Sequence, residues 1–484
     1  MNAVPNAMQT PPLEVRESRD FRSYHAFLRA ARNFMEGPLV GAMHDAYERR
    51  ITAAGGTPPA DWRAAERVLD ETLEFQFYCW AYRNLQRFKY HRPTLGIFAT
   101  LEAQRERLVA QLEATAAATP TAELRLDAQL ELPEYFRFVP FHQHTGGVAK
   151  DALDGLAYEI GRRTTVPAHA DPNGIYRILF ESLPQKSYAR VLDWGTGHGA
   201  ALVTWQRLHP ESECHGVDLS APCLLVANQR GRENGMRLYL SQQDLEHLDY
   251  PDAHFDLIFF NFMLHELPRS HTRALLAEAC RVLKPGGLFA GHEFHLRPND
   301  PFQNVLQRSH AYTNNETYSI PWYDTDIVAR SRSRFRGREY RTVRTPQSLR
   351  APPRARPDQC QSLEPLPIPQ MNTPDFKAAL QGPVTDREPD FLRDVPPDNL
   401  VGAIVALTAE VYLLRERLQS LEAELAAHRV LPADAVERHV DDPVRAEAKA
   451  ADLAAYTQRV FTELVRDRVP VSHIDPRVGK YLGD

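Results

Sequence analysis

Short apolar segments alternate with helix-forming segments between Arg190 and Phe294, and this alternation limits the possible folds more than any other feature of the chain. Strands that alternate with helices form a parallel sheet, because each connecting helix crosses one face of the sheet and returns the chain to the same edge. The sequence therefore predicts an α/β core with helices on both faces. The five predicted strands are 191–193, 214–218, 238–240, 255–260 and 288–290.

Two helices of this core have recognisable ends. The first begins after Ser220, a typical N-cap residue, carries Pro222 in its first turn and ends at Asn234-Gly235. The second has apolar residues along one side and ends before Pro285-Gly286-Gly287. Each helix thus fits between two of the predicted strands.

The core accounts for only part of the 484 residues, a length that corresponds to about three domains at ~150 residues each. Helical periodicity dominates the N-terminal region, and dense proline without periodicity marks a linker nearer the C-terminus. We expect an N-terminal all-α domain, the α/β domain, a proline-rich linker and a C-terminal helical hairpin or coiled coil. Their predicted bounds are 1–140, 141–345, 346–397 and 398–484.

The N-terminal region contains the most aromatic segment of the chain, residues 74–83. Phe75, Tyr78 and Tyr82 fall on one face of a predicted helix. This pattern favours a buried helix; the alternative is a lid over a substrate.

The C-terminal region carries an unbroken heptad pattern from 400 to 425, with apolar residues four and three positions apart in turn. The helix with this pattern either folds back on a second helix at about 444–468 or pairs with its copy in a homodimer, and the sequence leaves both open. The positions of the pattern are Leu400, Ile404, Leu407, Val411, Leu414, Leu418, Leu421 and Leu425.

Charge and cysteine content exclude several classes of protein. With 63 acidic and 57 basic residues, the net charge of −6 excludes binding to nucleic acid or membranes through bulk charge. An arginine run at 330–356 has no aromatic ladder and favours a solvated edge over a nucleic-acid site. Five scattered cysteines, no signal peptide and no apolar span of ~18 residues favour a soluble cytoplasmic protein.

A glycine-rich turn follows the first predicted strand, as Asp193-Trp-Gly-Thr-Gly-His-Gly199. Glycines at this position allow a tight turn and let the backbone approach a ligand at the N-terminus of the next helix. Asp218 ends the second strand, where an acidic side chain can accept hydrogen bonds from both hydroxyls of a ribose. The spacing therefore predicts a nucleotide-type ligand.

Three further segments follow in order: Gln243-Asp-Leu245, Phe255–Glu266 and Arg281–Gly287. Together with the glycine turn, they resemble the class I S-adenosylmethionine-dependent methyltransferases, in particular the branch with ubiquinone and menaquinone methyltransferases. The resemblance covers residues 171–295 and implies a Rossmann-like fold with S-adenosylmethionine as cofactor. More loosely, Phe141–Gly147 and Asn314–Glu316 resemble features of an uncharacterised bacterial subgroup, which implies no particular substrate.

The resemblance also implies roles for ten residues at the cofactor. Asp193 would orient the glycine loop, Asp218 would hold the ribose, and Asp244 would accept a hydrogen bond from the adenine amine. The remaining residues would line the methionine part or pack on the adenine. The full set is Asp193, Gly195, Thr196, Gly197, Asp218, Leu219, Asp244, Leu245, Asn261 and Phe262.

His265 and His292 follow the fourth and fifth strands, at the edge where ligands of such sheets bind. Either imidazole can remove a proton from an acceptor, because histidine titrates near neutral pH; the alternative is that each only hydrogen-bonds a loop. His142, His144, His292 and His295 also raise the question of a metal site, but no spacing brings them together, so we expect no metal.

The sequence thus predicts an enzyme that transfers a methyl group from S-adenosylmethionine to a small-molecule acceptor. The acceptor atom (O, N, S or C) is left open. A protein methyltransferase recruited by the coiled coil and a non-catalytic S-adenosylmethionine-binding scaffold are the alternatives.

Overall fold

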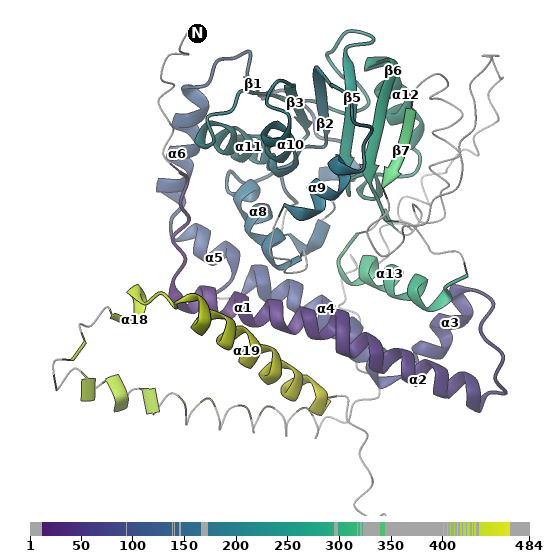
Figure 1. Cartoon of the computed structure of the whole chain (residues 1–484), viewed down its shortest axis with the longest axis vertical. Helices are drawn as coiled ribbons and strands as arrows, with labels where there is room; N and C mark the ends of the chain where they lie inside the picture. The colour runs from purple at the N-terminus through teal and green to yellow at the C-terminus, as the bar shows by residue number, and fades with distance from the viewer. Residues whose placement is uncertain are drawn as a thin grey trace, which may run out of the picture. The chain divides into compact units, whose positions relative to one another are not determined.

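A computed structural model gives the fold of the chain (Figure 1). It describes residues 12–92, 94–137, 139, 141–144, 147–165, 173–294, 299–316, 318, 319, 322, 339–343, single positions between 400 and 431, and 435–464. The predicted linker at 346–397, His295 and most of the arginine run lie outside the described residues.

A seven-stranded sheet forms the core, with every neighbouring pair of strands parallel. The spatial order is β1-β4-β3-β2-β5-β6-β7. All five predicted strands are confirmed; two outer strands, β1 and β7, were not predicted. The strands are β1 (Leu124–Arg125), β2 (Arg190–Trp194), β3 (Glu213–Asp218), β4 (Leu238–Gln242), β5 (Phe255–Asn261), β6 (Leu283–His292) and β7 (Glu339–Val343).

Helices cover both faces of the sheet, because successive strand residues point to opposite faces. Leu257 and Phe259 of β5 pack in one buried cluster with residues of α9, α10 and α11. Ile258 and Phe260 pack in the other, with residues of α12. The helices around the sheet are α8 (Asp154–Thr165), α9 (Gly174–Glu181), α10 (Ala200–Leu208), α11 (Ala221–Glu233), α12 (Thr272–Val282) and α13 (Pro301–Thr313).

The predicted helix ends hold for α11 and shift for α12. Ser220 caps α11, since its side-chain oxygen accepts a hydrogen bond from the backbone N–H of Cys223 at 3.1 Å, and the helix ends at Glu233. Helix α12 ends at Val282, and β6 begins at the next residue, so Pro285-Gly286-Gly287 lies inside the strand. The pairing of β6 with β5 changes register there, which accommodates the turn residues.

The chain divides into two compact units. The first comprises 1–29, 59–66 and 82–389 and contains the sheet; the second comprises 30–58, 67–81 and 390–484. The remaining helical segments are α1 (Arg19–Phe34), the π-turn η1 (Met35–Leu39), α2 (Val40–Ala53), α3 (Trp62–Leu69), α4 (Leu73–His91), α5 (Ile97–Glu102), α6 (Arg105–Ala117), α7 (Glu134–Arg137), η2 (Phe141–Gln143), η3 (Leu264–Glu266), α18 (Ala435–Arg438) and α19 (Pro443–Leu464).

The aromatic segment 74–83 lies in α4, where Phe75, Tyr78 and Tyr82 are all buried, as the prediction of a buried helix requires. The heptad positions from Leu400 to Leu425 are helical wherever they are described. Among them, Val411, Leu414, Leu418 and Leu421 are exposed by 55–59%. A coiled coil through this helix stays a prediction.

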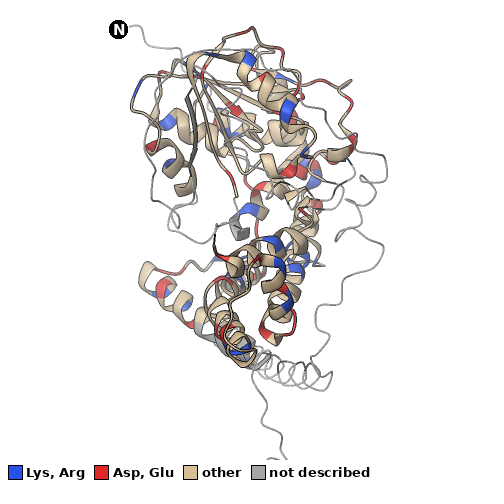
Figure 2. Cartoon of the chain, turned by 90° about the vertical axis from the view of Figure 1, so that its right-hand side faces the viewer, with Lys and Arg blue, Asp and Glu red and all other residues tan. Residues whose placement is uncertain are grey.

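Basic and acidic residues are interspersed along the described helices of both units, in line with the near-balanced composition (Figure 2). Within the described part of the chain, no helix combines the length and apolar character that a membrane span needs.

Gly199 joins the glycine turn to α10 at a point where two helices meet. Its φ is +75°, and an added Cβ would lie 2.8 Å from the Cβ of Ala227 in α11. Gly235, just beyond α11, has φ +63° but no atom within 4 Å of an added Cβ. The two glycines share a left-handed backbone and differ in packing.

We predict that Gly199→Ala lowers the free energy of unfolding by about 2–4 kcal/mol, the sum of backbone strain and overpacking. Gly235→Ala carries the strain alone and is expected to lower it by about 1–2 kcal/mol. Urea unfolding of the full chain measures both. Equal losses would contradict the close approach of α10 to α11.

Candidate active site

The glycine turn is held against the neighbouring strand by backbone hydrogen bonds. The N–H groups of Gly195 and Thr196 donate to the carbonyl oxygen of Val217 in β3, at 3.1 and 2.9 Å. Gly195 and Gly197 have φ of +77° and +52°, a conformation that glycine adopts at little cost. The predicted turn is therefore present at the carboxyl end of β2, where it leads into α10.

Two carboxylates, the buried Asp193 and the partly buried Asp218, fix this turn from the ends of β2 and β3. Asp193 Oδ2 accepts a hydrogen bond from Thr196 Oγ1 at 2.8 Å. Asp218 Oδ2 accepts one from the N–H of Gly197, and Asp218 Oδ1 one from the N–H of Ser220, both at 2.8 Å. Burial raises the pKa of Asp193 to about 7 and that of Asp218 to about 6. Both acids thus contact the glycine turn, which Asp193 was predicted to orient; the predicted role of Asp218 at the ribose stays a prediction.

The predicted adenine-side residues follow β3 and β4 at the same edge of the sheet. Leu219 and Leu245 are buried, and Asp244 is partly exposed. Asp244 Oδ1 accepts a hydrogen bond from the N–H of Glu246 at 2.9 Å, which orders its own loop. The predicted roles of these three residues at the adenine stay predictions.

Asn261 and Phe262 end β5 in an unusual local geometry. Neither polar atom of the Asn261 amide has a hydrogen-bond partner among the described residues, although both atoms are buried. Phe262 has φ of +50°, and its N–H donates to the carbonyl oxygen of His292 at 3.0 Å. A buried polar group without a partner costs about 1–3 kcal/mol. This amide therefore fits a ligand bound at the end of β5, as the predicted cofactor role requires.

His292 pairs with Asn261 across β5 and β6 and is fully buried. Both of its ring nitrogens also lack a hydrogen-bond partner within the described chain. Its ring stacks on Phe262 with centroids 5.7 Å apart. Burial lowers the pKa of His292 to about 4, so the ring is a neutral imidazole that can accept a hydrogen bond from a ligand.

His265, the second predicted catalytic histidine, is in the opposite charge state. Its Nδ1 lies 2.7 Å from Glu293 Oε1, and its Nε2 lies 4.0 Å from Glu316 Oε2. Burial alone lowers the pKa of His265, but the two carboxylates outweigh this effect and raise it to about 9. At neutral pH the ring is therefore an imidazolium held between two glutamates.

Glu316 is the centre of this arrangement. Its Oε1 lies 3.4 Å from His142 Nδ1 and 3.5 Å from His310 Nε2, and it accepts a hydrogen bond from Asn314 Nδ2 at 2.9 Å. Burial raises the pKa of Glu316, but the facing imidazoles of His310 and His142 hold it well below its usual value. The side chain is thus a buried carboxylate, only 2% exposed, that faces three imidazoles.

The network continues toward the surface through His142, whose Nε2 lies 2.9 Å from Glu266 Oε1. Glu266 and His142 are 25% and 18% exposed, against 2% or less for Glu293 and His265. We call these side chains the carboxylate–imidazole cluster. Its members are His142, His265, His310, Glu266, Glu293 and Glu316.

The cluster unites segments that the sequence singled out separately. The histidine of Phe141–Gly147 and the glutamate of Asn314–Glu316 meet beside the residues that follow β5 and β6. His310 was not predicted, and no local pattern in α13 distinguishes it. Titratable groups whose pKa values are shifted by burial and by charged neighbours are common at functional sites, so this cluster is a candidate active site.

The metal hypothesis for the predicted histidines does not fit this arrangement. His142 Nδ1 and Nε2 face Glu316 and Glu266, whereas His144 Nδ1 bonds the carbonyl oxygen of Gly147. The ring of His144 packs edge-on against Tyr90 and Phe98. His142 and His144 therefore contact different groups and do not form a shared metal site.

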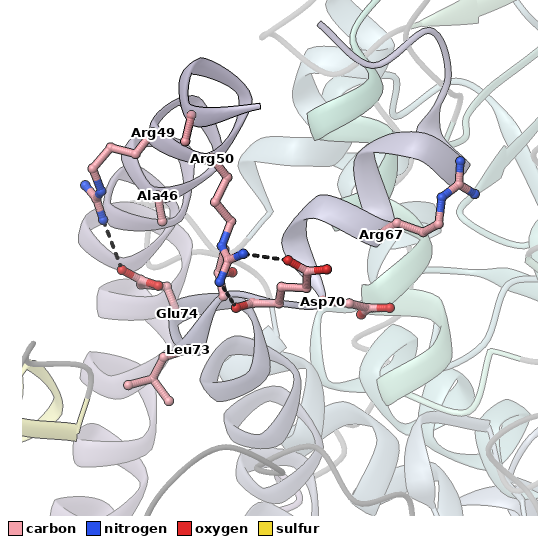
Figure 3. Close-up of a pocket in the computed structure, with 10 residues that line it drawn as sticks. Ala46, Arg49, Arg50, Arg67, Asp70, Leu73 and Glu74 are labelled. Carbon is pink, nitrogen blue, oxygen red and sulfur yellow. Dashed lines mark hydrogen bonds and ion pairs between the residues drawn. The ribbon is translucent and has the colours of Figure 1, made fainter. Parts of the chain in front are cut away.

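A cavity of about 1140 Å³ lies in the second unit, between α2 and the residues around the start of α4 (Figure 3). Arg49 pairs with Glu74 at 3.6 Å, and Arg50 pairs with Glu71 at 2.5 Å. None of the predicted site residues lines this cavity, and its charges of both signs are largely paired with each other.

Comparison with known proteins identifies the domain that holds the site. Residues 191–287 match the family model described as a methyltransferase domain. The match begins in β2 and ends in β6, so it includes the glycine turn, Asp218, Asn261 and His265.

Curated relatives match part of the chain. The ubiquinone/menaquinone biosynthesis C-methyltransferase UbiE of Laribacter hongkongensis is 37% identical over 106 residues, which are 22% of this chain and 43% of the relative. The enzyme of the same name from Chromobacterium violaceum is 35% identical over 116 residues, 23% of this chain and 47% of the relative. The chain spans less than half the length of these relatives.

Solved structures that resemble the chain include geranyl diphosphate C-methyltransferase from Streptomyces coelicolor A3(2), with a TM-score of 0.29 and 21% identity. The likeness covers 37% of this chain and 64% of that chain. YcgJ from Bacillus subtilis has a TM-score of 0.26 and 24% identity, over 30% of this chain and 61% of that chain.

The family match and the curated relatives confirm the predicted resemblance to class I S-adenosylmethionine-dependent methyltransferases for this part of the chain. The cofactor of this class is S-adenosylmethionine, as predicted. The regions outside residues 191–287 have no counterpart in this match.

The carboxylate–imidazole cluster predicts a specific dependence of stability on pH. His142 and His265 have folded-state pKa values raised to about 9, above the ordinary value of about 6.5 that they regain on unfolding. Their contribution to stability is therefore complete below about pH 6.5 and is lost as the pH rises through about 9. Glu316→Gln removes a carboxylate that raises both values, so the loss between pH 7 and pH 9 should shrink.

Glu123→Gln is the matched control, because Glu123 is also buried but pairs with Arg232 and Arg237, which keep their charge in this range. Urea unfolding at a series of pH values measures the three proteins. If the Glu316→Gln curve runs parallel to that of the wild type, the assigned charge states are wrong.

Proposed function

We propose that this protein is a methyltransferase that moves a methyl group from S-adenosylmethionine to a small-molecule acceptor. The observation that supports this most is the position of the carboxylate–imidazole cluster and of His292. His292 ends β6, and His265 and Glu293 of the cluster follow β5 and β6, at the edge of the sheet that also carries the glycine turn. A cofactor site and groups able to handle protons therefore share one edge.

In this proposal the chain holds the cofactor through the ten predicted residues. Asp218 accepts hydrogen bonds from the ribose, the turn at Gly195–Gly197 lines the methionine part, and the amide of Asn261 gains the partner that it lacks. S-adenosylmethionine supplies a methyl group activated by a positively charged sulfur. The protein then contributes alignment of the acceptor and exclusion of water.

The two predicted catalytic histidines take different roles because their charges differ. The neutral ring of His292 accepts a hydrogen bond from the acceptor and takes its proton as the methyl group is transferred, so that the ring ends the step as an imidazolium. The imidazolium of His265, fixed by Glu293, stabilises negative charge that develops on the acceptor as its proton leaves. Both roles require an acceptor whose reacting atom carries a proton.

Burial supports a small acceptor over a protein. Glu293, Glu316 and His265 are each at most 2% exposed, so an acceptor that reaches them must enter the domain. The curated relatives are named as C-methyltransferases of ubiquinone and menaquinone biosynthesis, so carbon stands beside oxygen, nitrogen and sulfur among the acceptor atoms.

Regions outside the matched domain complete the proposal. We assign the N-terminal helices to an all-α domain within residues 1–140 and the heptad helix at 400–425 to a homodimer. The exposed apolar positions Val411, Leu414, Leu418 and Leu421 support the pairing, since a heptad seam is stable when a partner helix covers it. The absence of a disulfide framework in the sequence supports a cytoplasmic location.

Cofactor binding tests the first part of the proposal. We expect Asp218→Ala to weaken binding of S-adenosylmethionine about 10- to 100-fold, because charge-assisted hydrogen bonds to the ribose contribute about 1.5–3 kcal/mol. Calorimetric titration measures the affinity, and Asp218→Asn separates loss of charge from loss of the loop contacts. Asp249→Ala, which removes an exposed carboxylate paired with Arg125, is the control. A folded wild type that releases no heat would refute the proposal.

Methyl transfer tests the second part. With methyl-labelled S-adenosylmethionine and a small-molecule extract of the host cell, we expect His265→Gln and His292→Gln each to lower turnover about 10²- to 10⁴-fold. Both variants should bind the cofactor with the affinity of the wild type. His44→Ala, at an exposed position of α2, is the control and should change neither turnover nor cofactor affinity. Label in the host's proteins would favour the protein methyltransferase, and cofactor binding without any transfer would favour the scaffold.

A further inference from the structure

A second group of histidine and glutamate side chains lies at the amino ends of the strands. The candidate active site lies at their carboxyl ends. Glu213 opens β3, His215 is the third residue of the same strand, and His254 immediately precedes β5. Each offers a ligand atom, and these three atoms lie within 4.8 Å of one another. Because β3 and β5 are parallel to β2 between them, their amino ends meet at one edge and their carboxyl ends at the other.

The chemistry of the group suits a transition metal ion. Two imidazoles and one carboxylate are ligands that zinc accepts, and a water molecule can complete a tetrahedral set. His215 Nε2 lies 2.9 Å from Glu213 Oε1. Two ligand atoms at about 2.1 Å from a tetrahedral zinc ion are about 3.4 Å apart, so the pair needs to open by only about 0.5 Å.

The ring of His215 is already oriented as a metal ligand would be. Its second nitrogen, Nδ1, lies 3.3 Å from the hydroxyl of Tyr250, and its face stacks on Tyr239 with centroids 4.8 Å apart. Ligating histidines typically use their other nitrogen in such a hydrogen bond, which fixes the ring. Tyr250 and Tyr239 thus hold Nε2 toward Glu213.

Positive charges near the group are the main competitors of a metal ion. Arg190 Nε lies 3.2 Å from Glu213 Oε1, with side chains 44% and 40% exposed. Lys284 is nearby but pairs with Asp256 at 2.8 Å. An exposed ion pair contributes little net stability, so Arg190 can give way to a metal ion.

We propose that Glu213, His215 and His254 bind a divalent transition metal ion, with zinc as the typical occupant. The ion would join the start of β3 to the segment before β5 across the start of β2. Since the catalytic edge is at the other ends of these strands, the ion stabilises the sheet and takes no part in methyl transfer. This site is distinct from the histidines that the sequence analysis considered, and it does not depend on the proposed function.

The test is titration of the full-length, chelator-treated protein with zinc chloride by calorimetry, and with cobalt(II) chloride by absorption spectroscopy. We expect the wild type to bind one zinc ion at this site and to gain thermal stability. His254→Ala and Glu213→Gln should each weaken binding at least about 10-fold and abolish the gain. Neither position is fully buried, so both variants should fold.

The matched control is His209→Ala. His209 and Glu211 form a histidine–glutamate pair two residues apart, with Nδ1 3.9 Å from Oε1. This variant should bind zinc as the wild type does. Three results would overturn the proposal: no binding by the wild type, unchanged binding by both variants, or loss of binding only in Glu316→Gln, which would place the ion in the carboxylate–imidazole cluster.

Discussion

The parallel pairing of β3, β2, β5 and β6 is the constraint on which the rest of the structure depends. It places the carboxyl ends of four strands side by side, so that Asp218, the glycine turn, Asn261 and His292 meet although they are far apart in the sequence. Backbone hydrogen bonds from the turn to β3 and from Phe262 to β6 then fix the loops between these ends. The same pairing places Glu213 and His254 together at the amino edge.

Two buried glutamates of the carboxylate–imidazole cluster are paired with histidines. Glu293 and Glu316 are buried carboxylates, and each faces an imidazole rather than an arginine or a lysine. An imidazole can gain or lose a proton near neutral pH, whereas arginine stays charged. Glu123, which pairs with two arginines, shows how the same chain builds an ion pair that serves structure alone. The choice of partner therefore distinguishes a proton-handling site from a structural one.

Much of the fold could be predicted because its signals are local. Apolar runs of strand length, the cap at Ser220 and the glycines after β2 depend on neighbours in the sequence. Strand β1 was not predicted because two residues are too few to show a periodic pattern. Strand β7 was not predicted because it has only five residues and lies within an arginine-rich region. The end of α12 was misplaced because the pairing of β6 with β5 draws the chain into a strand before its glycines are reached.

The candidate site could likewise be predicted only where its residues belong to local motifs. Residues of the turn and of the strand ends belong to recognisable motifs, but the contacts of Glu316 with His142 and His265 span 174 and 51 residues, which no local pattern encodes. The charge states of the histidines follow from burial and from neighbouring carboxylates, and not from residue type. His265 follows β5 and His292 ends β6, yet the first is an imidazolium and the second a neutral ring.

The amide of Asn261 and the ring of His292 have no hydrogen-bond partner among the described residues, and this also bears on how the site selects its ligand. A buried donor or acceptor that has already lost its water gains almost the whole of a new hydrogen bond when a matching ligand arrives. A close analogue that lacks the matching group leaves the same atoms unsatisfied and is rejected strongly, by up to about 10⁴–10⁵ in sites built this way. Selectivity at this edge would then come from the polar atoms of two side chains, which form no stabilising hydrogen bond with the described residues.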